Sequence, residues 1–391
     1  AGMTIRPLAR VLPPQEEWVL MTYRALDGRV LEIRLPWQIR SSTGTIAFTL
    51  PPLSAANVRA SAKSSQRKRT GRTRESKAMA SLTAYGIDVQ MEAVNLSRRD
   101  LYASVPTRKR ARRKAGREDV QDLRSSMPGA LRARAIKIKG RHVGHLRIFT
   151  FAVPDADAFV KEIVRLIAQL PSRALILDVR NNGGGLIWAA EQLLQIFTNR
   201  TIEPERAQLL NSSTTLQLAR LNSTSTHAAS LNLQPWAESI SRAVVTGAVY
   251  SEGFPITPPE RANAIGQKYR GKVVLITDAL AYSATDMFIA GFRDHEIGPI
   301  LGVDDNTGAG GANVWSYPLL QQLFADDETR WKDLPGGCDL RVAARRMLRV
   351  GANAGMPLED LGVVPDARHY LTRRDVLEQN QDLLEHAASL I

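Results

Sequence analysis

The chain has 391 residues, of which 44% are hydrophobic, and it carries a formal net charge of +13. This length exceeds one ordinary domain, and the hydrophobic fraction is sufficient for a sizeable buried core. The single cysteine, Cys338, excludes an internal disulfide and a zinc site built on cysteine pairs, and no apolar run is long enough to span a membrane.

The N-terminal region predicts a β-hairpin. Two runs of alternating apolar residues, 18–24 and 29–37, flank Asp27-Gly28. Asp-Gly between such runs is a strong short-range hairpin signal. A hairpin by itself is not stable in water, so we expect this first unit, 1–53, to pack on the core or on another module.

The net positive charge is concentrated in one stretch of the chain. Between residues 59 and 117, 17 Lys and Arg residues stand against four acidic residues, which accounts for the entire excess. A stretch rich in Ser, Ala, Arg and Lys is typical of a solvated insertion, and the alternative is an arm that binds an acidic partner or nucleic acid. The balanced charge elsewhere argues against a basic face on a folded DNA-binding domain. We therefore expect 54–129 to be a basic, partly flexible insertion.

From residue 130 to 391 the patterns predict an α/β core with parallel strands. A polar, weakly patterned surface excursion is expected over 199–240. Alternation and continuous apolar runs predict strands over 131–138, 143–151, 174–179, 242–250, 271–277 and 298–303. The helical period predicts helices that start after Pro154 and over 186–197 and 283–293, and a last helix to about Ser389 that begins with a Thr372–Asp375 capping box.

Ser283 lies where the predicted strand 271–277 gives way to a helix. The first amides of a helix have no intrahelical partners, and the helix dipole places partial positive charge there. A hydroxyl at this point can attack a carbonyl while the N–H of Ala284 faces the oxyanion that forms. The alternative interpretation is that Ser283 is an ordinary N-cap.

A glycine-rich turn, Asn181–Gly185, follows the buried strand 174–179. Its three glycines allow the backbone to approach a ligand closely and to direct an N–H at it. Asp178 and Arg180 can pair and brace the turn. The alternatives are a plain strand-to-helix connection and a phosphate-binding loop, although no GxGxxG or GxxxxGK[ST] pattern is present.

The order of these motifs resembles that of the C-terminal-processing proteases, a family that includes the tricorn core protease and the retinoid-binding repeats of the eye. The resemblance covers roughly 130–200 and 264–391. It rests on ALILDVRNNGGGL, GKVVLITDALAYSATDMF, GPILGVDDNTGAGG and LEDLGVVPD. It implies a ClpP/crotonase-like spiral core, a peptidase that acts on polypeptides without a cofactor or metal, Ser283 as nucleophile and Gly184 as an oxyanion donor beside Ala284.

The N-terminal hairpin is similar to the last strands of a PDZ domain, which in this family binds the C-terminal tail of the substrate. Only that end is present, so the sequence predicts a trimmed or degenerate PDZ-like module. The start of the chain, Ala1-Gly2-Met3, shows no targeting segment and indicates no compartment.

A serine nucleophile needs a general base. Ser-Lys members of the family carry a lysine in a loop that resembles Thr307–Gly311, but Ala309 stands at or next to that position, so the dyad is absent. Tricorn-type members use Ser, His and Glu instead. Resemblance to them nominates Glu359, and their histidine comes from a region before the PDZ domain that this chain does not contain. Of the histidines here, His145 is the candidate on a core strand, and a structural buried histidine is the alternative.

The general base is therefore unassigned, and three explanations stay open. It was trimmed away, it arrives from another subunit of a homo-oligomer, or the domain no longer cleaves. We expect a serine endopeptidase that processes C-terminal tails. The alternatives are a silent family member that binds peptide or an apolar ligand, a crotonase-like acyl-CoA enzyme, and a binder of acidic partners or nucleic acid through 59–117.

Overall fold

A computed structural model describes residues 18–24, 28–36, 39–41, 44–46, 120–224, 233–311, 314–317, 320–321, 324, 331–338 and 340–391. The described strands up to residue 46 belong to one unit, and residues from 120 onward belong to a second. The two are described separately below. The basic stretch 59–117, with the partner expected for it, lies outside the described residues.

The N-terminal unit contains the predicted hairpin. Strands β1 (Trp18–Arg24) and β2 (Val30–Pro36) pair antiparallel from Trp18 opposite Pro36 to Arg24 opposite Val30. Gly28 in the connection has φ +87°, a backbone conformation that glycine adopts without steric cost. Two short strands, β3 (Ile39–Ser41) and β4 (Gly44–Ile46), form a second antiparallel pair. The hairpin prediction is confirmed, and its relation to a PDZ domain stays a prediction.

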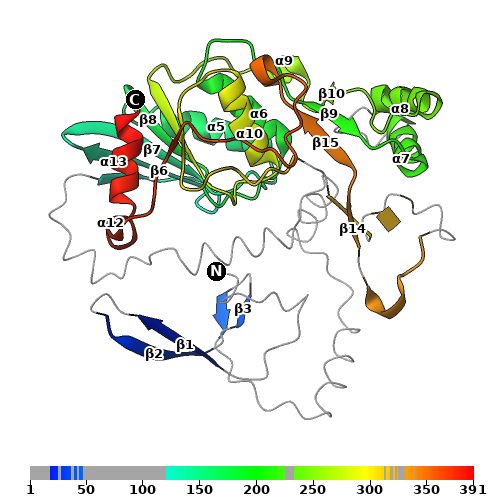
Figure 1. The fold of residues 1–391 in the computed structure, drawn as a ribbon. Helices are drawn as coiled ribbons and strands as arrows, with labels where there is room; N and C mark the ends of the chain where they lie inside the picture. The colour runs from blue at the N-terminus through cyan, green and yellow to red at the C-terminus, as the bar shows by residue number, and fades with distance from the viewer. Residues whose placement is uncertain are drawn as a thin grey trace. The chain divides into compact units, whose positions relative to one another are not determined.

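A mixed sheet of seven strands forms the centre of the second unit (Figure 1). The first three strands along the chain pair antiparallel, and the remaining strands join them in parallel. The α/β core with parallel strands is thereby confirmed. The order across the sheet is β16 (Ala367–Arg368), β12 (Ile300–Gly302), β11 (Lys272–Thr277), β8 (Ala174–Asp178), β7 (Arg141–Ile148), β6 (Leu131–Ile138) and β5 (Val120–Leu123).

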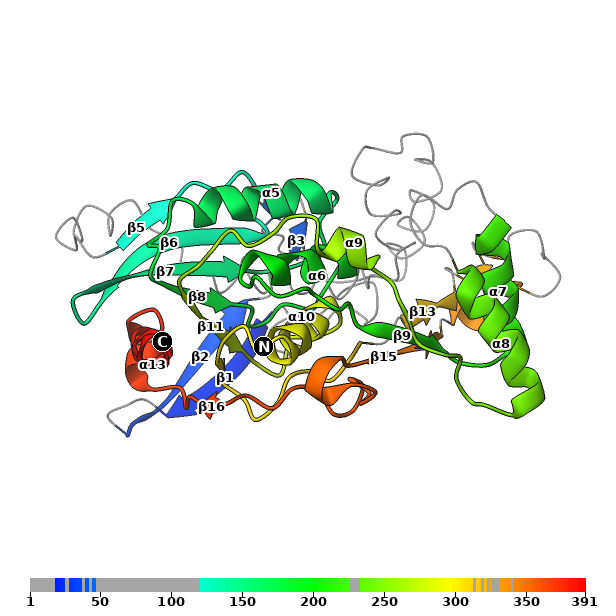
Figure 2. The ribbon, with the colours of Figure 1, turned by 90° about the horizontal axis from the view of Figure 1, so that it is seen from above.

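Helices cover both faces of this sheet (Figures 1 and 2). Alternate strand residues, such as Leu175 and Leu177, face one large core together with α5 (Ala156–Ile167), α6 (Ile187–Ile196) and α10 (Ala284–Asp294). The intervening residues, such as Ile176, face a smaller core under α13 (Gln381–Ser389). Among the described residues, no helix is long and apolar enough to cross a bilayer.

The predicted C-terminal helix is two helices. Thr372 and Asp375 form the expected capping box, but the helix that they start, α12, spans only Arg373–Leu377. Gln379 and Asn380 then take positive φ angles of 61° and 64°, which interrupt the helix before α13 begins. The capping-box prediction is confirmed, and a single continuous helix is wrong.

The predicted excursion 199–240 contributes to the core where it is described. It contains β9 (Arg206–Leu209), α7 (Ser213–Thr224) and the start of α8 (Gln234–Thr246). Trp236 of α8 is buried, and its indole N–H donates to the Ala207 carbonyl (2.8 Å). The strand predicted over 242–250 is wrong, because α8 runs to Thr246 and ends at the left-handed Gly247.

Short elements complete the second unit. Strands β9, β10 (Phe254–Pro255) and β15 (Arg345–Leu348) form an antiparallel sheet, and Figure 2 shows β9 and β15 extending from the α10 side toward α7 and α8. The other elements of the described residues are β13 (Val314–Ser316), β14 (Arg341–Ala343), helix α9 (Pro259–Ala262) and the 3-10 turns Pro335–Gly337 and Gly351–Asn353.

Candidate active site

Two strand-to-helix turns meet at the carboxyl ends of neighbouring parallel strands, β8 and β11. The Tyr282 N–H donates to the Asn182 carbonyl (3.1 Å), and the Asn181 N–H donates to both oxygens of Asp278 (2.9 and 2.8 Å). These bonds tie the glycine turn after β8 to the turn that carries Ser283. Because parallel strands end at the same edge of a sheet, residues a hundred positions apart are brought together here.

Gly184 lies directly against Ser283. A Cβ placed on Gly184 would lie 2.6 Å from the Ser283 Cβ, 2.7 Å from the Tyr282 carbonyl oxygen and 2.9 Å from the Ala284 nitrogen. Gly184 also has φ +101°, which disfavours any L side chain. The position therefore requires glycine for two independent reasons, and the predicted approach of residues 184 and 283 is present.

Ser283 adopts a strained backbone conformation, with φ 57° and ψ −126°. Such an outlier costs about 1–3 kcal/mol in a non-glycine residue and persists only where the surroundings impose it. Ser283 occupies the N-cap position of α10, but its hydroxyl makes no capping hydrogen bond. Ser283 as a residue is half-buried rather than sealed in packing. The ordinary N-cap interpretation therefore does not explain this residue.

The two predicted oxyanion donors differ in their hydrogen bonds. The amide of Ala284 is the first of α10 and is buried, and it has no hydrogen-bond acceptor within the described part of the chain. The amide of Gly184 instead donates to the Asn182 side-chain oxygen (3.0 Å). Asn182 is itself fully buried and donates from its side chain to the Ile148 carbonyl (3.2 Å). In this arrangement, one donor is free to meet an oxyanion and the other is occupied.

The loop Thr307–Gly311 packs around the start of α10. The Ser283 N–H donates to the Gly310 carbonyl (2.6 Å), and the Gly310 N–H donates to the Asp286 carboxylate (2.8 Å). Burial raises the pKa of Asp286 to about 6, against the hydrogen bonds from this loop, and the nearby charge of Glu359 adds to the rise. Ala309 stands in this loop with φ 57°.

Glu359 lies beside the same loop. A Cβ on Gly311 would lie 3.0 Å from its Oε1, and its carboxylate accepts the Met347 N–H (3.0 and 2.9 Å). Partial burial raises the pKa of the Glu359 carboxyl, while the Met347 amide and the guanidinium of Arg345 oppose the rise. Glu359 is thus held beside the loop that contacts Ser283, and its role in catalysis stays a prediction.

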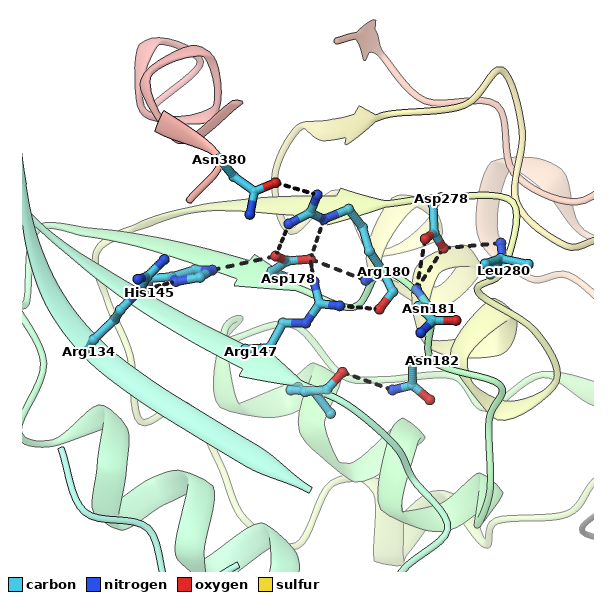
Figure 3. Close-up of polar contacts among 11 residues, drawn as sticks. Arg134, His145, Arg147, Asp178, Arg180, Asn181, Asn182, Asp278, Leu280 and Asn380 are labelled. Carbon is cyan, nitrogen blue, oxygen red and sulfur yellow. Dashed lines mark hydrogen bonds and ion pairs between the residues drawn. The ribbon is translucent and has the colours of Figure 1, made fainter. Parts of the chain in front are cut away.

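His145 belongs to a different cluster, shown in Figure 3. Its Nδ1 accepts a hydrogen bond from Arg134 (2.8 Å), and its Nε2 lies 3.6 Å from an oxygen of Asp178. Burial lowers the pKa of His145 to about 4, although Asp178 opposes the decrease. The neighbouring Leu146 faces the core that α10 covers, so strand alternation turns His145 to the opposite face. The structure therefore does not bring His145 to Ser283.

Asp178 forms the centre of this cluster and braces the glycine turn. It pairs with Arg180 (2.8 Å), as the sequence predicted, and also with Arg147. Burial alone raises the pKa of Asp178, but the two guanidinium groups outweigh it and hold that pKa well below its usual range. Arg180 also donates to Asn380, the residue before α13 (3.2 Å) (Figure 3). Through Arg180, the cluster holds the backbone at the start of the glycine turn in place.

Sequence reasoning assigned no role to Asp286, Asp278 or Asn182. Asp286 was visible in the Ser-Ala-Thr-Asp run, three residues after the serine, which places it one helical turn away. Nothing in the sequence indicated that Asp278 and Asn182 would connect the two turns. Among the described residues, no three His, Cys, Asp or Glu side chains group in a way that would hold a metal ion.

Comparison with known proteins gives one family match. The model of peptidase family S41 matches residues 142–367, which is more than half of the chain. No curated protein matches the sequence.

Solved structures extend the comparison. Mature CPAF complexed with lactacystin has a TM-score of 0.55 at 16% identity, over 95% of this chain and 67% of that one. A second mature CPAF structure has a TM-score of 0.48 at 18% identity, over 65% of this chain and 53% of that one, so the chain spans about half of its length. The photosystem II D1 C-terminal processing protease has a TM-score of 0.37 at 18% identity, over 70% and 52%. At these identities the first likeness supports the fold alone.

Proposed function

Because the chain belongs to peptidase family S41, we propose that it is a serine endopeptidase that cleaves polypeptides through an acyl-enzyme on Ser283. One observation carries this proposal. Ser283 has a strained backbone at a strand-to-helix turn, and its hydroxyl makes no capping hydrogen bond. Beside it lies the buried amide of Ala284, which has no acceptor among the described residues. A strained serine at such a turn is the geometry that presents a nucleophile and an oxyanion donor to one carbonyl.

In the proposed reaction, the Ser283 oxygen attacks the scissile carbonyl and gives up its proton to a base. The Ala284 N–H stabilises the negative oxygen of the tetrahedral intermediate, and one such donor is typically worth about 3–4 kcal/mol of the barrier. The intermediate then expels the amine, which takes a proton, and water hydrolyses the ester on Ser283. Gly184 supplies a second donor once its amide leaves the Asn182 side chain.

In this proposal the base is neither His145 nor a lysine of the loop 307–311. His145 is engaged by Arg134 and Asp178, and Ala309 occupies the loop where Ser-Lys relatives carry lysine. We propose a Ser-His-Glu arrangement in which Glu359 orients a histidine. That histidine would be supplied by another part of the protein or by a second copy of the chain.

We also propose that the substrates are the C-terminal tails of proteins. This finer proposal is supported by the resemblance of the hairpin β1–β2 to the end of a tail-binding PDZ domain. We further propose that the chain has three parts: a PDZ-like remnant over 1–53, a basic insertion over 54–129 and the peptidase core over 130–391.

A second candidate function is a family member that binds peptide or an apolar ligand without cleaving it. Two observations favour it. The Gly184 amide is occupied by Asn182, and neither His145 nor the residue at position 309 offers Ser283 a base.

Labelling with a fluorophosphonate probe and mapping of the labelled peptide separate the two candidates. We expect modification of Ser283 that is lost in Ser283→Ala. Ser212→Ala is the matched control, because the Ser212 hydroxyl does cap a helix, with the Thr215 N–H donating to it (3.1 Å). That variant should lose about 1 kcal/mol of stability and keep the label. A folded wild-type protein that binds peptides but never takes the label would support the silent binder instead.

A further inference from the structure

Asp286 is a buried carboxylate that the proposed reaction does not use. It lies in the first turn of α10, three residues after Ser283, and is fully buried. Burying a carboxylate is costly unless hydrogen bonds compensate. Its Oδ2 accepts the Gly310 N–H (2.8 Å), so the carboxylate holds a backbone amide of the neighbouring loop.

Gly310 connects this carboxylate to the nucleophile. The carbonyl of the same residue accepts the Ser283 N–H (2.6 Å). Gly310 therefore bonds with its N–H to the residue at 286 and with its carbonyl to the residue at 283. Through its N–H and its carbonyl, Gly310 thus fixes the loop against the start of α10.

The loop also has little freedom to shift. The Gly308 N–H donates to the Ala281 carbonyl (2.8 Å), just before Ser283. A Cβ on Gly310 would lie 2.0 Å from the Tyr282 ring, so the glycine backbone packs directly on that ring. On the far side, the Ala309 carbonyl accepts the Asp360 N–H (3.1 Å). With the loop held on these sides, the Gly310 carbonyl stays aimed at the Ser283 amide.

We propose that Asp286 is a positioning residue that keeps Ser283 in its strained conformation through Gly310. The carboxylate fixes the Gly310 amide, the Gly310 carbonyl holds the Ser283 N–H, and the serine backbone cannot relax into an ordinary N-cap. An uncapped hydroxyl next to the Ala284 amide is the consequence. The link to catalysis rests on the proposed function, but the effect on the backbone of Ser283 does not.

The test compares Asp286→Ala and Asp286→Asn with the wild-type full chain. Asparagine keeps an oxygen that can accept the Gly310 N–H, whereas alanine removes it. The matched control is Asp294→Ala, which removes a buried carboxylate at the other end of the same helix, where it pairs with Arg349 and Asn353. This control reports the effect of general destabilisation.

Two readouts are needed. Amide hydrogen exchange at Ser283, resolved by fragmentation of the peptide that contains it, reports the Ser283–Gly310 bond without any need for activity. The second-order rate of fluorophosphonate labelling reports the placement of the hydroxyl. We expect Asp286→Ala to speed exchange at Ser283 by about 10-fold or more and to slow labelling by about 10- to 100-fold, since small misplacements of reacting atoms have effects of this size. In Asp286→Asn, both the exchange rate at Ser283 and the labelling rate should be close to the wild-type values.

The outcomes are distinguishable. If Asp286→Ala changes exchange and labelling no more than Asp294→Ala does, the positioning role is wrong while the serine mechanism stands. If the wild-type protein is never labelled but Asp286→Ala still speeds exchange at Ser283, the positioning role holds and the proposed function fails.

Discussion

The substitution Gly184→Ala tests whether the contact between the two turns sets the position of the nucleophile. The added methyl would start 2.6 Å from the Ser283 Cβ and 2.7 Å from the Tyr282 carbonyl oxygen. Ordinary contacts between such atoms are about 3.5–4.0 Å, so one of the two turns must move by about 1 Å. Because hydrogen bonds from Tyr282 and Asn181 join the turns, the displacement is expected to reach Ser283.

Gly184→Ala is expected to have two effects, one on stability and one on the reaction rate. A side chain at φ +101° costs about 1–2 kcal/mol of stability by itself. Gly140, in the β6–β7 turn, has φ +82° and no atom within 4 Å of an added Cβ, so Gly140→Ala carries a comparable backbone cost without the steric contact. A displacement of about 1 Å at the reacting atoms is expected to slow reaction at Ser283 by about 100-fold.

Two quantities are measured for both variants: the rate of fluorophosphonate labelling and the free energy of unfolding in urea. We expect both variants to be destabilised and only Gly184→Ala to lose labelling. If Gly184→Ala is labelled as fast as wild type, the reasoning is refuted, because the contact between residues 184 and 283 would then not position the hydroxyl. Loss of labelling in Gly140→Ala as well would show that lower stability alone explains the effect.

Two further predictions concern acidic side chains. Burial raises the pKa of Glu191 from 4.5 to about 7, so the folded protein binds this proton more tightly than the unfolded chain and stability falls as pH rises from about 4.5 to 7. Glu191→Gln should therefore be more stable than wild type at pH 8, by up to about 3 kcal/mol, and equal to it near pH 4. The measurement is urea unfolding at both pH values, and the same gain in unfolding free energy at both would contradict this prediction. Glu359→Gln keeps an acceptor for the Met347 N–H but removes the charge that would orient a histidine, so labelling should slow by up to about 10⁴-fold with little change in the unfolding free energy. Unchanged labelling would remove Glu359 from the mechanism.

Much of the core could be predicted because its signals are local. The continuous apolar runs predicted β8 and β11 to within a residue or two, and the helical period did the same for α10 and for the start of α5. The region 242–250 misled because Val244, Val245 and Val249 favour a strand, whereas the burial of Trp236 and the helix end at Gly247 extend α8 to Thr246.

The candidate site was less accessible to sequence reasoning, because its decisive features are contacts between distant residues. The motif order was enough to place Gly184 beside Ser283. It did not reveal that the Asn182 side chain takes the Gly184 amide, since that bond depends on the conformation of the turn. His145 was a reasonable candidate by residue type, but strand alternation and Arg134 direct its ring to the other face of the sheet.

The most direct measurement is a crystal structure of the full protein soaked with a peptide aldehyde. A covalent bond from the Ser283 oxygen to the aldehyde carbon is expected, with the resulting oxygen about 2.7–3.1 Å from the Ala284 nitrogen. A peptide that binds without a bond to Ser283, or an adduct whose oxygen points away from Ala284, would contradict the assignment of this serine as the nucleophile.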